Sequence, residues 1–181
     1  ELTGYFGNKK KHPLKYLGNI NQISKYLKKN TKVKICIAMG PLNIRKMLLK
    51  KYKKNILTYV SKNSIISKLA KVSLGSFVQN SCFIGNYSKI GKACKINVGT
   101  NIHHNSLIGS FTDIAPSSTI LGNVKIGNYC YIGSGTIVRE KVKILNNIMT
   151  GIKSAVVKNL IKDGLYIGVP AKRVKSYYER P

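Results

Sequence analysis

An aliphatic residue occurs at every sixth position of this chain from residue 66 to residue 144. The series holds at fourteen consecutive positions: Ile66, Val72, Val78, Ile84, Ile90, Ile96, Ile102, Ile108, Ile114, Ile120, Ile126, Ile132, Val138 and Ile144. A second series, mostly of small residues, stands two positions before it: Ser64, Ala70, Ser76, Cys82, Ser88, Cys94, Thr100, Ser106, Thr112, Ser118, Val124, Cys130, Thr136 and Val142. A period of six matches neither an α-helix nor a plain strand, and it is typical of a parallel β-helix solenoid.

Three such hexapeptides form one triangular coil, so the repeat predicts between four and five coils. We expect the aliphatic side chain to point into the prism and the small residue to share its crowded interior. Glycine recurs directly after the aliphatic residue, as Gly85, Gly91, Gly109, Gly127 and Gly133. We therefore expect this next position to form the bend, where a positive φ suits glycine and, less well, Asn, Asp or His.

Before the repeat, strand and helix patterns alternate, which predicts a partial, Rossmann-like α/β unit over residues 1–60. Strands are expected over 2–6, 32–39 and 56–60. Asn19 is expected to cap a short helix, and Pro41 to begin a second one that ends near residue 53. The chain opens on Glu1 within an expected strand, which suggests that further residues precede it.

The β-helix domain is predicted over residues 61–181, including a basic C-terminal tail. The repeat is expected to break after Ile144, because position 150 is a threonine. An inserted loop is expected at Asn146–Asn147, and a last coil or a short exit segment is expected near 154–161.

Composition narrows the possible partners and the compartment. The formal net charge is +27, which raises nucleic acid or an anionic surface as a partner. The lysines are spread along the chain without an aromatic RNA-binding motif, so no nucleic-acid partner is predicted. No apolar run is long enough for a transmembrane helix. Cys82, Cys94 and Cys130 occupy the small inward position and no C-x-x-C pair occurs, which predicts core thiols and a cytoplasmic location.

The chain has three histidines, His12, His103 and His104. No metal site is expected, because His12 lies far from the other two in sequence. His103 directly follows Ile102 and is expected at a bend with positive φ. His104 is expected to project outward beside an edge of the prism. An exposed imidazole there is either a surface residue or a general base that works near neutral pH.

Three segments make the function more specific: Ile102-His103-His104-Asn105-Ser106-Leu107-Ile108-Gly109, Gly122-Asn123-Val124-Lys125-Ile126-Gly127, and Gly164-Leu165-Tyr166-Ile167-Gly168-Val169-Pro170-Ala171-Lys172-Arg173-Val174. Together they resemble the hexapeptide-repeat acyltransferases that acetylate sugars, above all the nucleotide-aminosugar N-acetyltransferases of the bacillosamine type and the sialic acid O-acetyltransferases. The resemblance covers nearly the whole chain and includes Tyr16–Ile20, Ile37–Gly40 and Arg45.

The resemblance implies a homotrimer of left-handed β-helices that binds acetyl-CoA between neighbouring subunits. It implies that His104 is the general base in a direct transfer to the acceptor, with Asn105 beside it as a modulating residue. It further implies cofactor contacts from four positions: Asp113, Gly122, Ser134 and Ile152. The acceptor is expected at the N-terminal unit, with four candidate contacts: Gly7, Asn8, Gly40 and Arg45.

The chain departs from the family pattern at three places. Asn105 follows the histidine where relatives commonly have an acid, Asp113 stands in place of a second histidine, and Gly7-Asn8 replaces paired acids. An amine is a better free nucleophile than a hydroxyl and tolerates a weaker base, which favours N-acetylation of a nucleotide-linked amino sugar in glycan biosynthesis. Two alternatives stay open: a sugar or sialic acid O-acetyltransferase, and an inactive trimeric scaffold.

Overall fold

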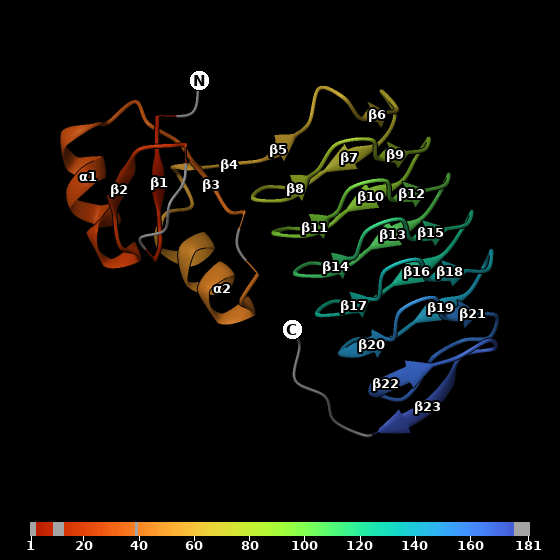
Figure 1. Cartoon of the computed structure of the whole chain (residues 1–181). Helices are drawn as coiled ribbons and strands as arrows, with labels where there is room; N and C mark the ends of the chain where they lie inside the picture. Colours follow the sequence, from red (N-terminus) through yellow and green to blue (C-terminus); the bar gives the residue numbers. More distant parts are fainter. Residues whose placement is uncertain (1–2, 9–12, 39, 176–181) are drawn as a thin grey trace. The chain divides into compact units, whose positions relative to one another are not determined.

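The computed structural model describes residues 3–8, 13–38 and 40–175, and Glu1, His12 and Met39 lie outside these ranges. The chain divides into two compact units, Glu1–Lys34 and Ile35–Pro181. The larger unit is a parallel β-solenoid in which short strands stack coil upon coil (Figure 1). The predicted parallel solenoid is therefore confirmed.

The solenoid has three faces, each a parallel ladder of short strands. Face 1 contains β5 (Tyr59–Val60), β8 (Phe77–Val78), β11 (Lys95–Ile96), β14 (Asp113–Ile114), β17 (Tyr131–Ile132), β20 (Ile148–Thr150) and β22 (Gly164–Ile167), and β23 (Lys172–Lys175) adds an antiparallel end. Face 2 contains β6 (Ile65–Ile66), β9 (Phe83–Ile84), β12 (Asn101–Ile102), β15 (Thr119–Ile120), β18 (Ile137–Val138) and β21 (Ala155–Val156). Face 3 contains β7 (Lys71–Val72), β10 (Lys89–Ile90), β13 (Leu107–Ile108), β16 (Lys125–Ile126) and β19 (Lys143–Ile144).

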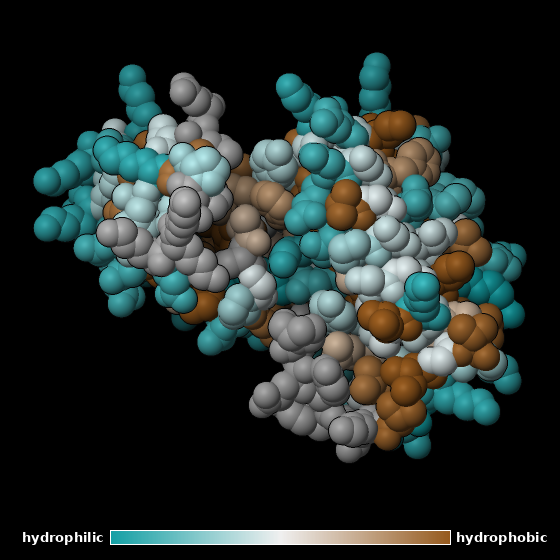
Figure 2. Space-filling view, in the orientation of Figure 1, coloured by the Kyte–Doolittle hydropathy of each residue, from teal (hydrophilic) through white to brown (hydrophobic). Residues whose placement is uncertain are grey.

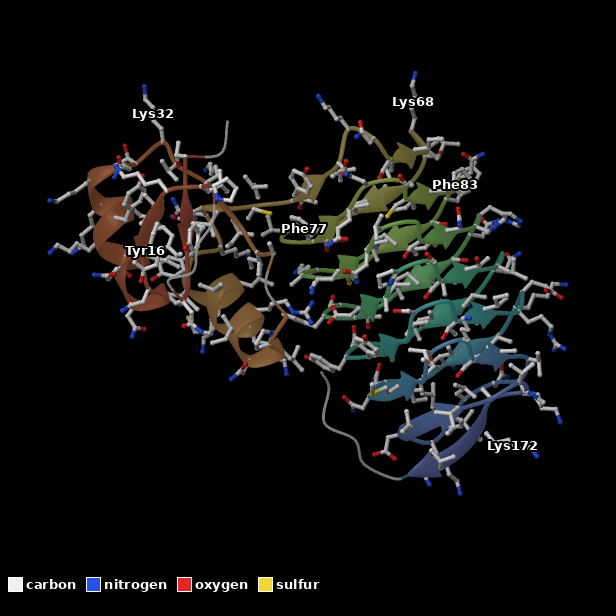
Figure 3. All side chains as sticks on the ribbon, viewed as in Figure 1. Tyr16, Lys32, Lys68, Phe77, Phe83 and Lys172 are labelled. Carbon is white, nitrogen blue, oxygen red and sulfur yellow. The ribbon has the colours of Figure 1, made fainter. Side chains whose placement is uncertain are left out.

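The register of these ladders follows directly from the repeat. Each strand pairs with the strand three hexapeptides further along, for example Ile102 with Ile120 and Ile108 with Ile126. The aliphatic series forms one apolar core, in which only Ile66 and Val72, near the first coil, are partly exposed. In Figure 3, Phe77 and Phe83 project from two different sides of the solenoid, as expected for outward residues of faces 1 and 2.

The small inward residues do more than fill space, because their polar atoms join successive coils. The Ser88 hydroxyl donates to the His103 carbonyl at 2.8 Å and accepts from the Ser106 amide at 3.2 Å. The Cys94 thiol lies 3.0 Å from the Gly109 carbonyl in the same arrangement. Burial raises the pKa of the Cys94 thiol to about 12, so this cysteine is a neutral core residue, as predicted.

The predicted bend position is wrong by two residues. Positive φ occurs three positions after the aliphatic residue, at Tyr87, Asn105 and Asn123 for example, and not directly after it. The glycines after the aliphatic residue are needed for clearance: a Cβ on Gly91 would lie 2.5 Å from the Ser110 amide nitrogen of the next coil. His103 therefore does not have the left-handed backbone that its position suggested, whereas Asn105 does, with φ 58°.

The expected break after Ile144 is also wrong. Thr150 stays in phase as a fully buried residue of β20, and Val156 continues the series in β21. The threonine is tolerated because its hydroxyl accepts from the Gly133 amide at 2.9 Å and lies 3.2 Å from the Thr136 hydroxyl. Asn147 occupies the ordinary positive-φ position, so no loop is inserted there.

The N-terminal residues form short elements. In the first unit, β1 (Tyr5–Phe6) pairs in parallel with β2 (Tyr16–Gly18), and Asn19 caps the 3-10 helix η1 (Ile20–Gln22) that leads into α1 (Ile23–Lys29), as predicted. In the second unit, β3 (Ile35–Cys36) pairs with β4 (Ile56–Leu57) on either side of α2 (Leu42–Lys51). The described strands here form two-stranded sheets, β1 with β2 and β3 with β4, so the expected partial Rossmann-like unit is not confirmed.

Exposed apolar side chains gather near the C-terminal coils, where Figure 2 shows a brown surface. They include Ile152 at 76% exposure and Val169 at 76%. Across the part of the chain that the structure describes, no helix has the length and apolarity needed to span a bilayer.

We expect Gly91→Ala to destabilise the solenoid, because the new methyl group would meet the backbone of the next coil. Overpacking of this kind costs about 1–3 kcal/mol, which thermal unfolding followed by circular dichroism would report as a lower midpoint. Gly40→Ala is the matched control, since its nearest neighbour would be the Lys95 Nζ at 4.0 Å. Equal midpoints for the two variants would contradict the clearance argument.

Candidate active site

His104 lies at the corner between faces 2 and 3, and its backbone is held by both adjacent coils. The His104 carbonyl accepts from the Asn123 amide at 2.9 Å. On the other side, a Cβ on Gly85 would lie 2.9 Å from the His104 nitrogen. The imidazole lies over Gly122, where a Cβ would come within 2.7 Å of Cε1 and Nε2. The side chain is exposed, so a rigid corner presents an accessible imidazole, as expected.

Asn105 is the hydrogen-bond partner of this imidazole. Its side-chain Nδ2 lies 3.0 Å from His104 Nδ1. The left-handed φ of 58° at Asn105 is a conformation that asparagine tolerates well. Asn105, which was predicted to modulate His104, is therefore in direct contact with its imidazole.

His103 has a different environment from its neighbour. It is half-buried, and its ring stands edge-on to Phe83 of the preceding coil, with ring centroids 6.0 Å apart. Its amide donates to the Ile120 carbonyl at 2.8 Å. These contacts describe a packing residue on face 2, so the two adjacent histidines are not equivalent.

Two of the predicted cofactor residues lie at a second corner, between faces 1 and 2. Ser134 and Ile152 are three hexapeptides apart and occupy the same position in successive coils, where the Lys153 amide donates to the Ser134 carbonyl at 2.7 Å. Ser134 is half-buried, and Ile152 is largely exposed. Within one chain, this corner and the His104 corner border opposite edges of face 2.

Arg45 and Asp113, predicted separately for acceptor and cofactor contacts, form a buried ion pair. Arg45 Nη1 and Nη2 donate to Asp113 Oδ1 and Oδ2 at 2.5 and 2.9 Å, and Nη1 also donates to the Ala93 carbonyl at 2.9 Å. Arg45 is 1% exposed and Asp113 is 7% exposed. The pair fastens α2 to face 1 and neutralises the charge of Asp113, the residue that was predicted as a cofactor contact.

The remaining predicted acceptor contacts lie in two places. Gly40 precedes α2 and is half-buried, with open space around its Cα. Gly7 and Asn8 follow β1 in the smaller unit, where the Gly7 amide donates to the Gly18 carbonyl at 3.0 Å. Over the described residues, no three His, Cys, Asp or Glu side chains converge as metal ligands.

Two contacts of the site were not predicted from sequence. The position of Gly122 under the imidazole could have been found, because Gly122 follows His104 by three hexapeptides, which make one coil. The pairing of Arg45 with Asp113 could not, because 68 residues separate them and no local pattern links them.

Comparisons with known proteins give the fold an enzymatic context. No family model and no curated protein matches the chain. Among solved structures, PerB from Caulobacter crescentus in complex with CoA and GDP-perosamine superposes with a TM-score of 0.82 at 25% identity, covering 88% of this chain and 78% of that one. The acetyltransferase domain of PglB from Neisseria gonorrhoeae has a TM-score of 0.88 at 19% identity, covering 94% and 86%. The chain has the fold of these enzymes.

The resemblance inferred from sequence is therefore confirmed: structural neighbours of this chain are sugar N-acetyltransferases. A mutant of the Caulobacter GDP-perosamine N-acetyltransferase was solved with CoA and GDP-perosamine bound. The PglB domain was also solved in complex with acetyl coenzyme A, and that structure has a TM-score of 0.83 at 19% identity.

We expect Arg45→Ala to cost about 3–5 kcal/mol of unfolding free energy, because it leaves a buried carboxylate without its partner. The double variant Arg45→Met, Asp113→Leu is expected to recover most of this loss, since no charge is then buried. Denaturant unfolding measures both.

The control is Arg173→Ala. The Arg173–Asp163 pair is exposed and 3.5 Å long, and exposed pairs contribute about 0–1 kcal/mol. A loss for Arg45→Ala no larger than that for Arg173→Ala would show that the buried pair does not anchor α2.

Proposed function

We propose that this protein is an acetyl-CoA-dependent N-acetyltransferase acting on an amino sugar, and that this sugar is nucleotide-linked and used in glycan biosynthesis. The observation that carries the proposal is the exposed imidazole of His104, hydrogen-bonded by Asn105 and held between two coils. The similarity to enzymes solved with CoA and a nucleotide amino sugar supports it. It also supports a left-handed solenoid.

The chemistry needed at this corner is proton transfer. Acetyl-CoA supplies the acetyl group as a thioester, and the acceptor supplies a neutral amine. His104 Nε2 takes the proton that the amine loses as its nitrogen bonds to the acetyl carbon, and the imidazolium can then return a proton to the departing sulfur. Such a step requires an imidazole whose Nε2 is unprotonated and whose ring is fixed.

Asn105 can favour the tautomer with an unprotonated Nε2 if its side-chain amide group is rotated by about 180°. With Nδ2 donating, Nδ1 is the acceptor and a neutral ring carries its proton on Nε2. With Oδ1 facing the ring instead, Nδ1–H donates and Nε2 is free to act as the base. An amide supports both tautomers, whereas a carboxylate supports only the second. Asn105 is therefore a weaker orienting partner than the acid common in relatives.

A trimer would complete the site, and the outward row of face 2 supports one. This row is Ile65, Phe83, Asn101, Thr119, Ile137 and Ala155, without a charged residue in a chain of net charge +27. When three such faces meet about an axis, the His104 corner of one subunit lies beside the Ser134 and Ile152 corner of its neighbour. The exposed Ile152 would then offer apolar surface to coenzyme A.

The other assignments remain proposals. Gly122 serves by leaving room for the imidazole, and Gly7, Asn8 and Gly40 are retained as candidate acceptor contacts. Arg45 and Asp113 would act through each other, by fixing α2 beside the solenoid. A cytoplasmic location stays a proposal, and it is supported by the burial of the Cys82 and Cys94 thiols in the solenoid core without a disulfide.

We expect His104→Ala to lower turnover by about 10²–10⁴, the usual contribution of a positioned general base, while the fold and acetyl-CoA binding persist. Thiol release from acetyl-CoA is measured against nucleotide amino sugars and sialic acids. His103→Ala is the control, and it should retain activity.

Turnover with sialic acids alone would favour the O-acetyltransferase alternative. The absence of turnover with every acceptor, together with the absence of thermal protection by acetyl-CoA, would favour the scaffold.

We expect Asn105→Asp to move the acidic limb of the pH–rate profile to higher pH, because an adjacent carboxylate stabilises the imidazolium. Aspartate suits the positive φ at this position better than the longer Glu. Asn147→Asp is the control, since it has a φ of 57° at a different corner. If the profile shifts equally in both variants, residue 105 has no special influence on the protonation of His104.

We expect sedimentation equilibrium at micromolar concentration to give about three times the chain mass of 20.1 kDa. Ile137→Lys places a charge on the uncharged row of face 2 and should dissociate the assembly. Leu107→Lys makes the same change on face 3, where the mass should not change. A monomer that retains full activity would refute the intersubunit site.

A further inference from the structure

The outward row of face 3 is a ladder of lysines. Neighbouring strands place Lys71 opposite Lys89, Lys89 opposite Leu107, Leu107 opposite Lys125, and Lys125 opposite Lys143. All five side chains are exposed. Parallel strands lie about 4.8 Å apart, so the row extends about 19 Å along the solenoid. Figure 1 shows its strands, β7 to β19, stacked one below another.

Among the outward strand rows of the three faces, lysines are thus concentrated on face 3. The matching row of face 2 has no charged residue. On face 1 the row from β5 to β20 is Tyr59, Phe77, Lys95, Asp113, Tyr131 and Met149, with a single lysine. Face 1 is partly covered by α2. A basic composition by itself would place lysine on the outward row of face 2 as well as on that of face 3, so the segregation between these two rows needs its own explanation.

The ladder lacks compensating charge among the described residues. Like charges directly opposite each other on neighbouring strands destabilise a sheet. Two ion pairs join described residues to each other, Arg45–Asp113 and Arg173–Asp163, and neither involves this row. The row is a stack of cations that an external anion would stabilise.

The same face has a shallow hollow of about 430 Å³. Its lining combines Lys89, Lys125 and Lys143 with the apolar Leu107 and Leu145. Both leucines are 37% exposed. A row of ammonium groups around an apolar centre complements a surface with anionic groups outside and hydrocarbon beneath.

We propose that face 3 is a docking surface for an anionic phospholipid bilayer. The row is straight and built on a rigid sheet, so its four ammonium groups can meet a planar surface together. Single-stranded nucleic acid is a poorer match, because the row has no aromatic side chain on which bases could stack. This inference does not depend on the proposed acetyltransferase activity.

The test uses the full chain and sucrose-loaded vesicles of phosphatidylcholine with about one third phosphatidylglycerol. We expect sedimentation with these vesicles in 0.1 M salt, and loss of binding near 1 M, where the screening length falls to about 3 Å. The variant Lys89→Gln, Lys125→Gln should bind more weakly by about fivefold per lysine, since each lysine near an anionic surface contributes on that order.

The control is Lys62→Gln, Lys68→Gln, which removes the same charge from exposed positions outside the row. It should bind nearly as the unmodified chain does. Three results would overturn the proposal: equal losses in the two double variants, equal binding to pure phosphatidylcholine vesicles, or binding of an oligonucleotide but not of the vesicles.

Discussion

Everything in this solenoid depends on how closely one coil can lie on the next. The backbone hydrogen bonds between coils require neighbouring strands to pair at a spacing of three hexapeptides, and the core aliphatic residues then stack on one another. At several corners the approach leaves no room for a Cβ, so Gly91 and Gly109 are steric requirements rather than flexible points. Buried hydroxyls and thiols satisfy the carbonyls that these corners expose.

That close approach also fixes the position of His104, the proposed base. The backbone of this residue is held between the coils that contain Gly85 and Gly122, while its side chain reaches solvent. A group fixed by packing needs little reorganisation when a substrate arrives. The adjacent His103 packs against Phe83 instead, so a single step along the chain separates a structural imidazole from an available one.

The distribution of charge makes the three faces chemically different. Face 2 has an uncharged outward row that suits contact between subunits, and face 3 has a lysine row that suits an anionic surface. Face 1 receives α2 through the buried Arg45–Asp113 pair and through Lys46, whose Nζ lies 4.1 Å from the Tyr129 ring centre. The proposed subunit contact, the proposed bilayer docking and the packing of α2 would therefore use different faces of one prism.

The repeat alone determined the solenoid, its register of three hexapeptides, its aliphatic core and the outward position of His104, because each coil contacts only its neighbours. A local period is then sufficient to specify the architecture. Tertiary structure decided what the period leaves open. In the folded chain the positive φ occurs at Asn105 and not at His103. Thr150 stays in the core because its hydroxyl forms hydrogen bonds there. Arg45 pairs with Asp113, although 68 residues separate them. These outcomes depend on atoms brought together by stacking and on long-range packing, which a one-dimensional pattern does not contain.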